Sequence, residues 1–192
     1  MLGDRLLKVP VLGLNTGSEL ARTEEAIIDP SNLKIIAYSL SGPLLDTHPS
    51  FLATADIREI SNIGLIIDSS DEFVTEGDIV KLDTVYSLGF RLPHITVIDQ
   101  KKHKLGKVNG YTVNTSDFLI HQLSVKRPLF KSLSDTEILV HRSQIVEINN
   151  QNIIVRSEVE QVPKPIIESV QDTYVNPFRS NKPTAEHPTD TR

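Results

Sequence analysis

The sequence predicts an all-β protein in which two copies of one small barrel, or strongly curled sheet, follow each other along the chain. Residues 20–35 recur as residues 105–120, an offset of 85 positions. Residues 57–67 recur as residues 145–155, an offset of 88. A long repeat that occurs only twice is typical of a duplicated small domain. The repeated segments are rich in Ile and Val and lack long helical periodicity, which favours strands.

In each copy, a strand is predicted to run into a four-residue turn and to return as a second strand. The turns are residues 29–32 and 114–117. Asp29 and Asn114 open them, and such side chains accept hydrogen bonds from the backbone two residues further on. Pro30 fixes a backbone angle suited to a turn. Each repeat is therefore predicted to contain a β-hairpin here.

A second hairpin is predicted towards the end of each copy. Its strands are residues 57–60 and 65–67 in the first copy, and 145–148 and 153–155 in the second. Five or six short strands per copy are typical of a small barrel. A unit of about 65 residues buries only about 60% of the surface of its unfolded chain. We therefore expect the two copies to pack against each other.

The copies are predicted to be linked through one short helix. Apolar residues recur at helical spacing between Ile79 and Leu88, Asp78 suits the N-cap, and Gly89 suits the position after the helix. We expect this helix to cover an open barrel end or the seam between the copies. The predicted divisions are a first barrel, a linker, a second barrel and a tail, at residues 1–69, 70–91, 92–157 and 158–192.

The tail differs in composition from the rest of the chain. Five of the 11 prolines lie in residues 158–192, a stretch without glycine, and the chain is almost wholly polar from Asn176 onward. Such composition is typical of disorder. Residues 166–170 are expected to form one helical turn or an added strand that docks on the body. We interpret the tail as a tether or a partner-binding segment.

The net charge of −5 is unevenly distributed. Residues 1–85 carry −8, residues 86–157 carry +5 and the tail carries −2. Either the oppositely charged copies attract each other, or the charges lie on solvated faces, or the second copy presents a surface that attracts anions. The chain has no cysteine and no run long enough for a membrane helix, and its first eight residues lack the basic-then-apolar pattern expected of a secretory leader. These features predict a soluble, cytoplasmic protein of undefined oligomeric state.

The sequence does not predict an enzyme, a metal site or a cofactor. None of the six histidines lies at metal-ligand spacing from another, and there is no Gly-x-Ser-x-Gly motif. Glu59 and Glu147 occupy equivalent positions in the two copies. A residue that both copies share is best explained as a requirement of the fold. Residues present in one copy only are therefore the better candidates for function.

Basic residues of the second copy meet this condition. They lie in two segments, and the second of these also contains an aromatic residue. Such a set of residues could bind an RNA backbone and stack on one of its bases, or it could bind an acidic protein surface. The third interpretation is that these segments are solvated loops without a binding role. The candidate binding residues are Lys101, Lys102, Lys104, Lys107, Lys126, Arg127, Phe130 and Lys131.

The order of motifs resembles the PRC-barrel family. The second copy contains Leu105-Gly106-Lys107-Val108, and the first copy has Leu20-Ala21-Arg22-Thr23 at that place, followed by Ile27-Ile28-Asp29-Pro30. The resemblance covers about residues 6–69 and 92–157. The family includes a domain of the photosynthetic reaction-centre H subunit and the C-terminal domain of a ribosome maturation factor. This resemblance implies a non-enzymatic adaptor or scaffold that binds another protein. Its alternative is a ribosome-associated RNA-processing or small-subunit maturation factor that uses the basic second barrel.

Overall fold

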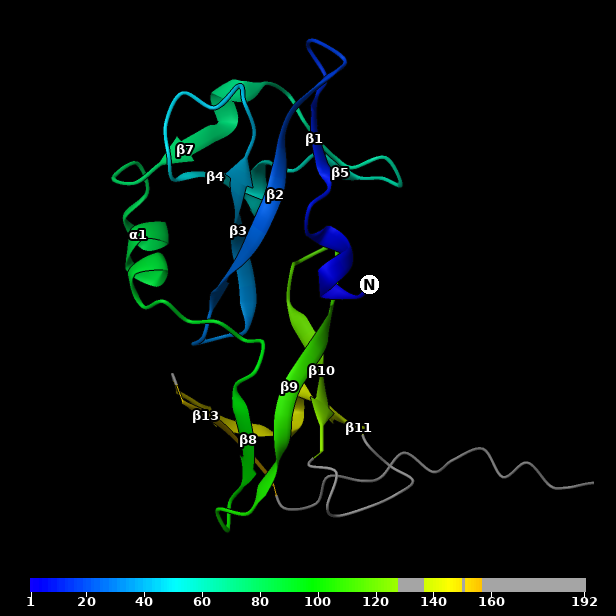
Figure 1. Cartoon of the computed structure of the whole chain (residues 1–192), viewed down its shortest axis with the longest axis vertical. Helices are drawn as coiled ribbons and strands as arrows, with labels where there is room; N and C mark the ends of the chain where they lie inside the picture. The colour runs from blue at the N-terminus through cyan, green and yellow to red at the C-terminus, as the bar shows by residue number, and fades with distance from the viewer. Residues whose placement is uncertain (128–136, 150, 157–192) are drawn as a thin grey trace, which may run out of the picture. The chain divides into compact units, whose positions relative to one another are not determined.

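A computed structural model describes residues 1–127, 137–149 and 151–156. The predicted tail and the candidates Phe130 and Lys131 lie outside these residues. The described chain is mostly β and forms two mixed sheets (Figure 1). Four 3-10 helices accompany them: η1 Gly3–Leu6, η2 Thr54–Asp56, η3 Ser70–Glu72 and η4 Arg142–Gln144.

The first sheet has seven strands in the order β5-β6-β1-β2-β3-β4-β7. The pair β1 and β6 is parallel, and the other neighbours are antiparallel. The strands are β1 Pro10–Gly13, β2 Ser18–Asp29, β3 Lys34–Ser41, β4 Ser50–Ala53, β5 Glu59–Ile60, β6 Leu65–Ile67 and β7 Phe73–Thr75.

The second sheet has six strands in the order β11-β10-β9-β8-β13-β12. It repeats the arrangement of the first, including one parallel pair, here β8 and β13. The strands are β8 Thr96–Asp99, β9 Lys104–Val113, β10 Ile120–Lys126, β11 Glu137–His141, β12 Ile145–Ile148 and β13 Asn152–Val155. The four predicted hairpins are thus present as β2–β3, β5–β6, β9–β10 and β12–β13.

Neither sheet closes into a barrel in the described part of the chain. The first sheet ends at β5 and β7, the second at β11 and β12, and the end strands do not pair with each other. The predicted pair of barrels is therefore not confirmed. The end strands have two to five residues each, so few backbone groups are available there to form a ladder that would join the ends of a sheet.

Apolar side chains from both halves are instead buried in one shared core. This cluster includes Leu6, Val11, Ile35 and Leu52 from the first half and Leu92, Val97, Ile120 and Val155 from the second. Each half thereby gains the buried surface that a unit of its size lacks alone.

The predicted short helix is present as α1, Val80–Ser87, and Gly89 follows it with a positive φ of 59°. Two details differ from prediction. The N-cap is Ile79 rather than Asp78, because the Asp78 carboxylate accepts a hydrogen bond from the Thr75 N–H (2.6 Å) instead. The helix also covers one face of the first sheet, not the seam or a barrel end (Figure 1). Within the predicted linker, β7 extends the first sheet by pairing with β4.

The two predicted turns have the same hydrogen bonds. The Asp29 carboxylate accepts from the backbone N–H and hydroxyl of Ser31, and the Asn114 side-chain oxygen accepts from the same groups of Ser116. The repeat seen in the sequence is therefore a repeat of local structure.

The hairpin turns also join the two halves through a reciprocal pair of hydrogen bonds. The Ile35 N–H donates to the Phe118 carbonyl (3.0 Å), and the Ile120 N–H donates to the Leu33 carbonyl (2.9 Å). Leu33 and Phe118 are both buried and both have positive φ values, 51° and 57°. The rings of Phe118 and Tyr38 pack edge to face with centroids 6.5 Å apart. The two halves are thus joined by the same backbone hydrogen bond in both directions, at equivalent positions of the repeat.

Candidate functional site

The structure places six of the eight predicted binding residues, all in the second half. Lys101 and Lys102 lie in the turn between β8 and β9, and Lys104 and Lys107 lie in β9. Lys126 ends β10 and Arg127 follows it. The five lysines are exposed and Arg127 is half-buried.

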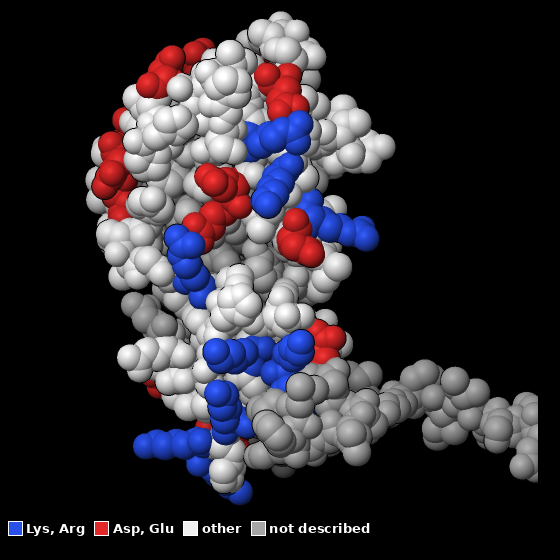
Figure 2. Space-filling model, viewed as in Figure 1, with Lys and Arg blue, Asp and Glu red and all other residues white. Residues whose placement is uncertain are grey.

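Four of these residues line one shallow hollow, which we call the basic hollow. It has a volume of about 490 Å³ and is lined by Lys104, Lys107, Lys126, Arg127, His94, Gly106, Val108 and Asn109. Lys107 and Lys126 are directly opposite in the antiparallel β9–β10 pair, so their side chains lie on the same face of the sheet. In Figure 2, the part of the molecule with β8 and β9 carries mainly Lys and Arg, whereas Asp and Glu gather beside α1 and both kinds of charge are mixed over the first sheet.

The equivalent place in the first half is neutral. There, at an offset of 85, Glu19, Arg22, Ser41 and Gly42 correspond to Lys104, Lys107, Lys126 and Arg127. The Arg22 guanidinium forms an ion pair with Glu19 (Nε to Oε1, 2.7 Å). None of the four cations of the basic hollow forms an ion pair with a described residue. Where the first half has one ion pair, the second half thus has four positive charges without an ion-pair partner among the described residues.

Gly106 explains how β9 and β10 approach each other beneath the hollow. A Cβ at this position would lie 2.2 Å from the Lys126 carbonyl oxygen, so no larger residue fits without moving the backbone. At the equivalent place of the first half, Ala21 corresponds to Gly106, and Gly42, just after β3, corresponds to Arg127. The glycine of the Leu-Gly-Lys-Val motif therefore allows the β9 and β10 backbones to lie in close contact beneath the hollow.

A buried carboxylate holds the turn that carries Lys101 and Lys102. Asp99 accepts hydrogen bonds from the His103 backbone N–H (2.8 Å) and lies 3.0 Å from the His103 Nδ1. Burial by itself would raise the pKa of Asp99, but these hydrogen bonds outweigh it and hold that pKa below its ordinary value. The carboxylate is consequently ionised at neutral pH and fixes the turn.

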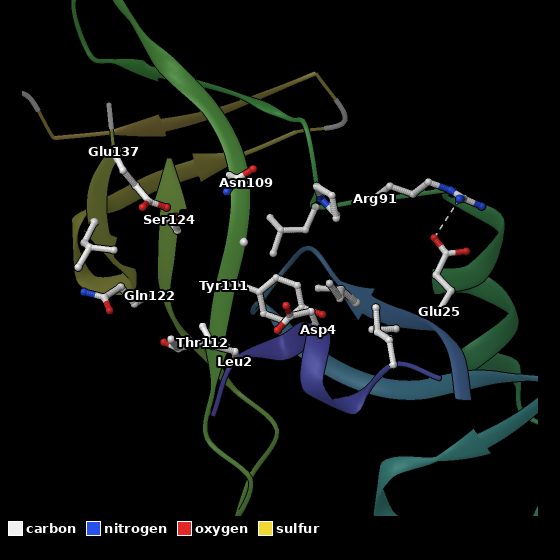
Figure 3. Close-up of a pocket in the computed structure, with 17 residues that line it drawn as sticks. Leu2, Asp4, Glu25, Arg91, Asn109, Tyr111, Thr112, Gln122, Ser124 and Glu137 are labelled. Carbon is white, nitrogen blue, oxygen red and sulfur yellow. Dashed lines mark ion pairs between the residues drawn. The ribbon is translucent and has the colours of Figure 1, made fainter. Parts of the chain in front are cut away.

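A second hollow, which we call the seam pocket, lies where the two halves meet (Figure 3). It has a volume of about 480 Å³. Its apolar wall includes Leu2, Leu7, Ile28, Leu92, Pro93 and Leu139, and its charged residues are Asp4, Glu25, Arg91 and Glu137. Arg91 and Glu25 form an ion pair at 3.0 Å across the two halves.

Tyr111 and Ser124 each bring a hydroxyl group to the lining of the seam pocket. Burial, with a smaller effect of the Asp4 charge, raises the pKa of Tyr111 to about 12, so its phenol stays protonated at neutral pH. The Ser124 hydroxyl has no hydrogen-bond partner in the described part of the chain, so no base activates it. Sequence reasoning missed this pocket because its wall comes from η1, β2, β9, β10 and β11, which are distant along the chain.

Residues 1–127, 137–149 and 151–156 contain neither a cluster of metal-ligating side chains nor a helix that could span a membrane. No group of three or more His, Asp or Glu side chains there is placed to hold a metal ion. No helix in these segments is both long and apolar enough to cross a membrane.

In comparisons with known proteins, no protein-family model and no curated protein sequence matches this chain.

Proposed function

We propose that this chain is a non-enzymatic adaptor that binds an acidic surface of another protein through the basic hollow. The observation that carries the proposal is the contrast between the two copies. At equivalent positions the first half has an ion pair of Glu19 with Arg22, and the second half has four cations that form no ion pair with any residue in the described ranges. A surface of this charge attracts anionic groups and accelerates encounter with them.

The stability cost of the hollow supports a binding role. Like charges placed directly opposite each other in an antiparallel pair are destabilising, and Lys107 faces Lys126 in this way. Residues that destabilise the local structure without a compensating structural contact are typical of functional sites. A solvated face without function would not require this pairing.

An acidic protein is favoured over single-stranded RNA by the composition of the hollow. Recognition of single-stranded RNA commonly stacks bases on aromatic side chains. No Phe, Tyr or Trp lines the basic hollow among the described residues, and the ring of His94 is the one stacking surface of this kind there. Phe130, the aromatic residue predicted beside these cations, lies outside the described part of the chain. The ribosome-associated RNA-processing role is therefore the second candidate, and it rests on the same cations.

We further propose that each half is a PRC-like module and that the chain acts in the cytoplasm. The modules are supported by the equivalent turns and the equivalent strand order of the two sheets. On this proposal the open sheets are variants of the barrel. The shared core makes them one platform rather than two independent units.

The test is affinity capture with the tagged full chain from a lysate of its own source, with and without ribonuclease. The test variant replaces Lys104, Lys107, Lys126 and Arg127 with Gln. The matched control removes the same number of exposed cations from the first half by replacing Arg5, Lys8, Arg58 and Lys81 with Gln.

We expect the native chain and the control to retain a protein partner after ribonuclease treatment. The test variant should lose this partner, and its melting temperature should not fall. Equal capture by both variants would overturn the proposed surface. Loss of all partners on ribonuclease treatment would overturn the adaptor in favour of the RNA-binding alternative.

A further inference from the structure

The charges that line the seam pocket do not balance. The lining contains the carboxylates of Asp4, Glu25 and Glu137 and the guanidinium of Arg91. Arg91 is paired with Glu25 at 3.0 Å, whereas Asp4 and Glu137 form no ion pair with a described residue. Three negative charges and one positive charge give the lining a formal net charge of −2. The seam pocket therefore attracts cations, whereas the basic hollow attracts anions.

Two hydroxyl groups of the seam pocket have no hydrogen-bond partner in the described ranges. The Ser124 oxygen is buried, and Tyr111 is only 8% exposed. In Figure 3 the Tyr111 ring lies beside Asp4 in the middle of the lining, and Ser124 lies near the Glu137 carboxylate. The Asp4 charge helps to raise the pKa of the Tyr111 phenol, as expected when the two groups are close. Since buried polar groups are normally hydrogen-bonded, these oxygens are available to accept from a ligand.

The rest of the wall is largely apolar and is held in place by contacts between the two halves. Met1 and Val113 exchange two backbone hydrogen bonds, at 2.9 and 2.8 Å. Gly3 lies so close to the Tyr111 ring that a Cβ at this position would overlap the ring. These contacts fix η1 of the first half on β9 of the second. A preformed cavity of about 480 Å³ with an apolar wall and a few polar groups is typical of a site for a small molecule.

Gly110 provides part of the space. It lines the seam pocket, and a Cβ at this position would meet no atom within 4 Å. The equivalent residue of the first half, at the offset of 85, is Glu25. The two copies thus differ here, as they do at the basic hollow, and a difference between copies favours a function over a requirement of the fold.

We propose that the seam pocket binds a small organic amine, that is, a molecule with a protonated amino group and an apolar body. An ammonium group carries three donors and no acceptor, so it can donate to both the Asp4 carboxylate and the Tyr111 oxygen. The apolar body then lies against the leucine side chains of the wall. An organic anion is repelled by the negative lining, and a neutral molecule leaves both carboxylates unpaired.

The bound amine also joins the two halves. The lining comes from η1 and β2 of the first half and from β9, β10 and β11 of the second. A ligand that contacts both halves binds only their assembled state, and it therefore stabilises that state against unfolding.

The first test compares probes that share a phenylbutyl skeleton and differ in charge: 4-phenylbutylamine, 4-phenylbutanol and 4-phenylbutyrate. Binding to the full chain is followed by NMR, through the amide signals of residues 2–7 and 109–112. We expect the amine to bind on the order of tenfold more tightly than the alcohol, and the anion more weakly than either, since a hydrogen bond to a charged group is worth about this factor. Equal affinities of the amine and the alcohol would overturn the proposal, as would shifts confined to the amide signals of other residues.

The second test removes one charge from the lining. Asp4→Asn keeps the size of the side chain, and Asp46→Asn is the control, because Asp46 is exposed and does not line the pocket. We expect Asp4→Asn to weaken binding of 4-phenylbutylamine on the order of tenfold and to leave 4-phenylbutanol unaffected, while Asp46→Asn changes neither affinity. An amine affinity that Asp4→Asn leaves unchanged is incompatible with the proposal.

A third variant, Gly110→Leu, fills the pocket from a position where the backbone leaves room for a side chain. It should abolish binding of the amine and the alcohol without lowering the midpoint of urea unfolding. Binding of either probe at its native affinity would place the site elsewhere and refute the proposal. The cations of the basic hollow are unchanged in every variant, so these outcomes are independent of the proposed adaptor function.

Discussion

Replacing Lys126 with Glu is expected to stabilise the protein. In the native chain Lys126 is directly opposite Lys107, and Lys104 and Arg127 line the same hollow. Opposite charges in a directly facing pair stabilise a sheet by roughly 0.2 to 1 kcal/mol, and like charges destabilise it similarly. Lys126→Glu removes a repulsion and adds an attraction, so the two effects add. Because both side chains are exposed, the gain in the free energy of unfolding lies towards the lower part of the summed range, at about 0.5 to 1 kcal/mol.

The assay is urea and thermal unfolding of the native chain, Lys126→Gln and Lys126→Glu at low salt. For a protein of this size the expected gain raises the melting temperature by about 1 to 4 °C. Gln should fall between the other two, because it removes the repulsion without adding an attraction. The differences should shrink in 1 M salt, where the screening length is only about 3 Å.

The matched control is Ser41→Glu, at the equivalent position of the first half. Ser41 faces Arg22, whose charge is already paired with Glu19, so a second carboxylate adds little. A Lys126→Glu variant no more stable than Lys126→Gln at low salt would refute the electrostatic reading of the hollow. Equal gains from Lys126→Glu and Ser41→Glu would do the same.

Three further outcomes follow from the geometry. Gly106→Ala should destabilise the chain by about 1 to 3 kcal/mol in urea unfolding, because its Cβ meets the Lys126 carbonyl oxygen at 2.2 Å; an unchanged midpoint would contradict this. Phe118→Ala should lower the free energy of unfolding by about 3 to 5 kcal/mol, because it removes a buried ring. Phe118→Gly should lower it by less, since glycine tolerates the φ of 57° at this position. A larger loss for Phe118→Gly than for Phe118→Ala would show that backbone strain has no role here. Burial raises the pKa of both Tyr38 and Tyr111, the latter to about 12, so the unfolded state ionises first. The stability that these neutral phenols contribute is therefore fully present below about pH 10 and is lost as the pH rises towards 12. Ultraviolet titration of the phenols should show that the two buried tyrosines ionise only as the chain unfolds. Ionisation of all tyrosines near pH 10 in the folded chain would contradict this expectation.

Local structure was largely predictable from the amino-acid sequence. Asp29 and Asn114 determine their turns through bonds to residues two positions away, which depend on nothing distant. The short helix ends at Ser87, two residues before Gly89, for a similar reason, since a residue without Cβ accepts the positive φ at position 89. The internal repeat showed that these features occur twice.

The candidate site was predictable in its composition but not in its geometry. The sequence identified Lys107 and Lys126 as members of a basic set in the second copy, and of these two positions only that of Lys107 has a basic counterpart, Arg22, in the first copy. Their direct opposition depends on the register of β9 and β10, which shifts irregularly near Ser124 and Val125. Such a shift results from packing between strands, and so the local pattern did not reveal which cations converge.

The sequence by itself determined the strand-rich class, the two copies, their hairpin turns and the opposite charges of the halves. Only the tertiary structure decided that the sheets stay open, that α1 covers the first sheet, and that one core extends through both halves. The physical reason is the range of the interactions. Turns and caps are set by neighbouring residues, whereas closure and burial depend on how well distant surfaces fit, as when the Leu33 and Phe118 carbonyls accept hydrogen bonds from the opposite copy.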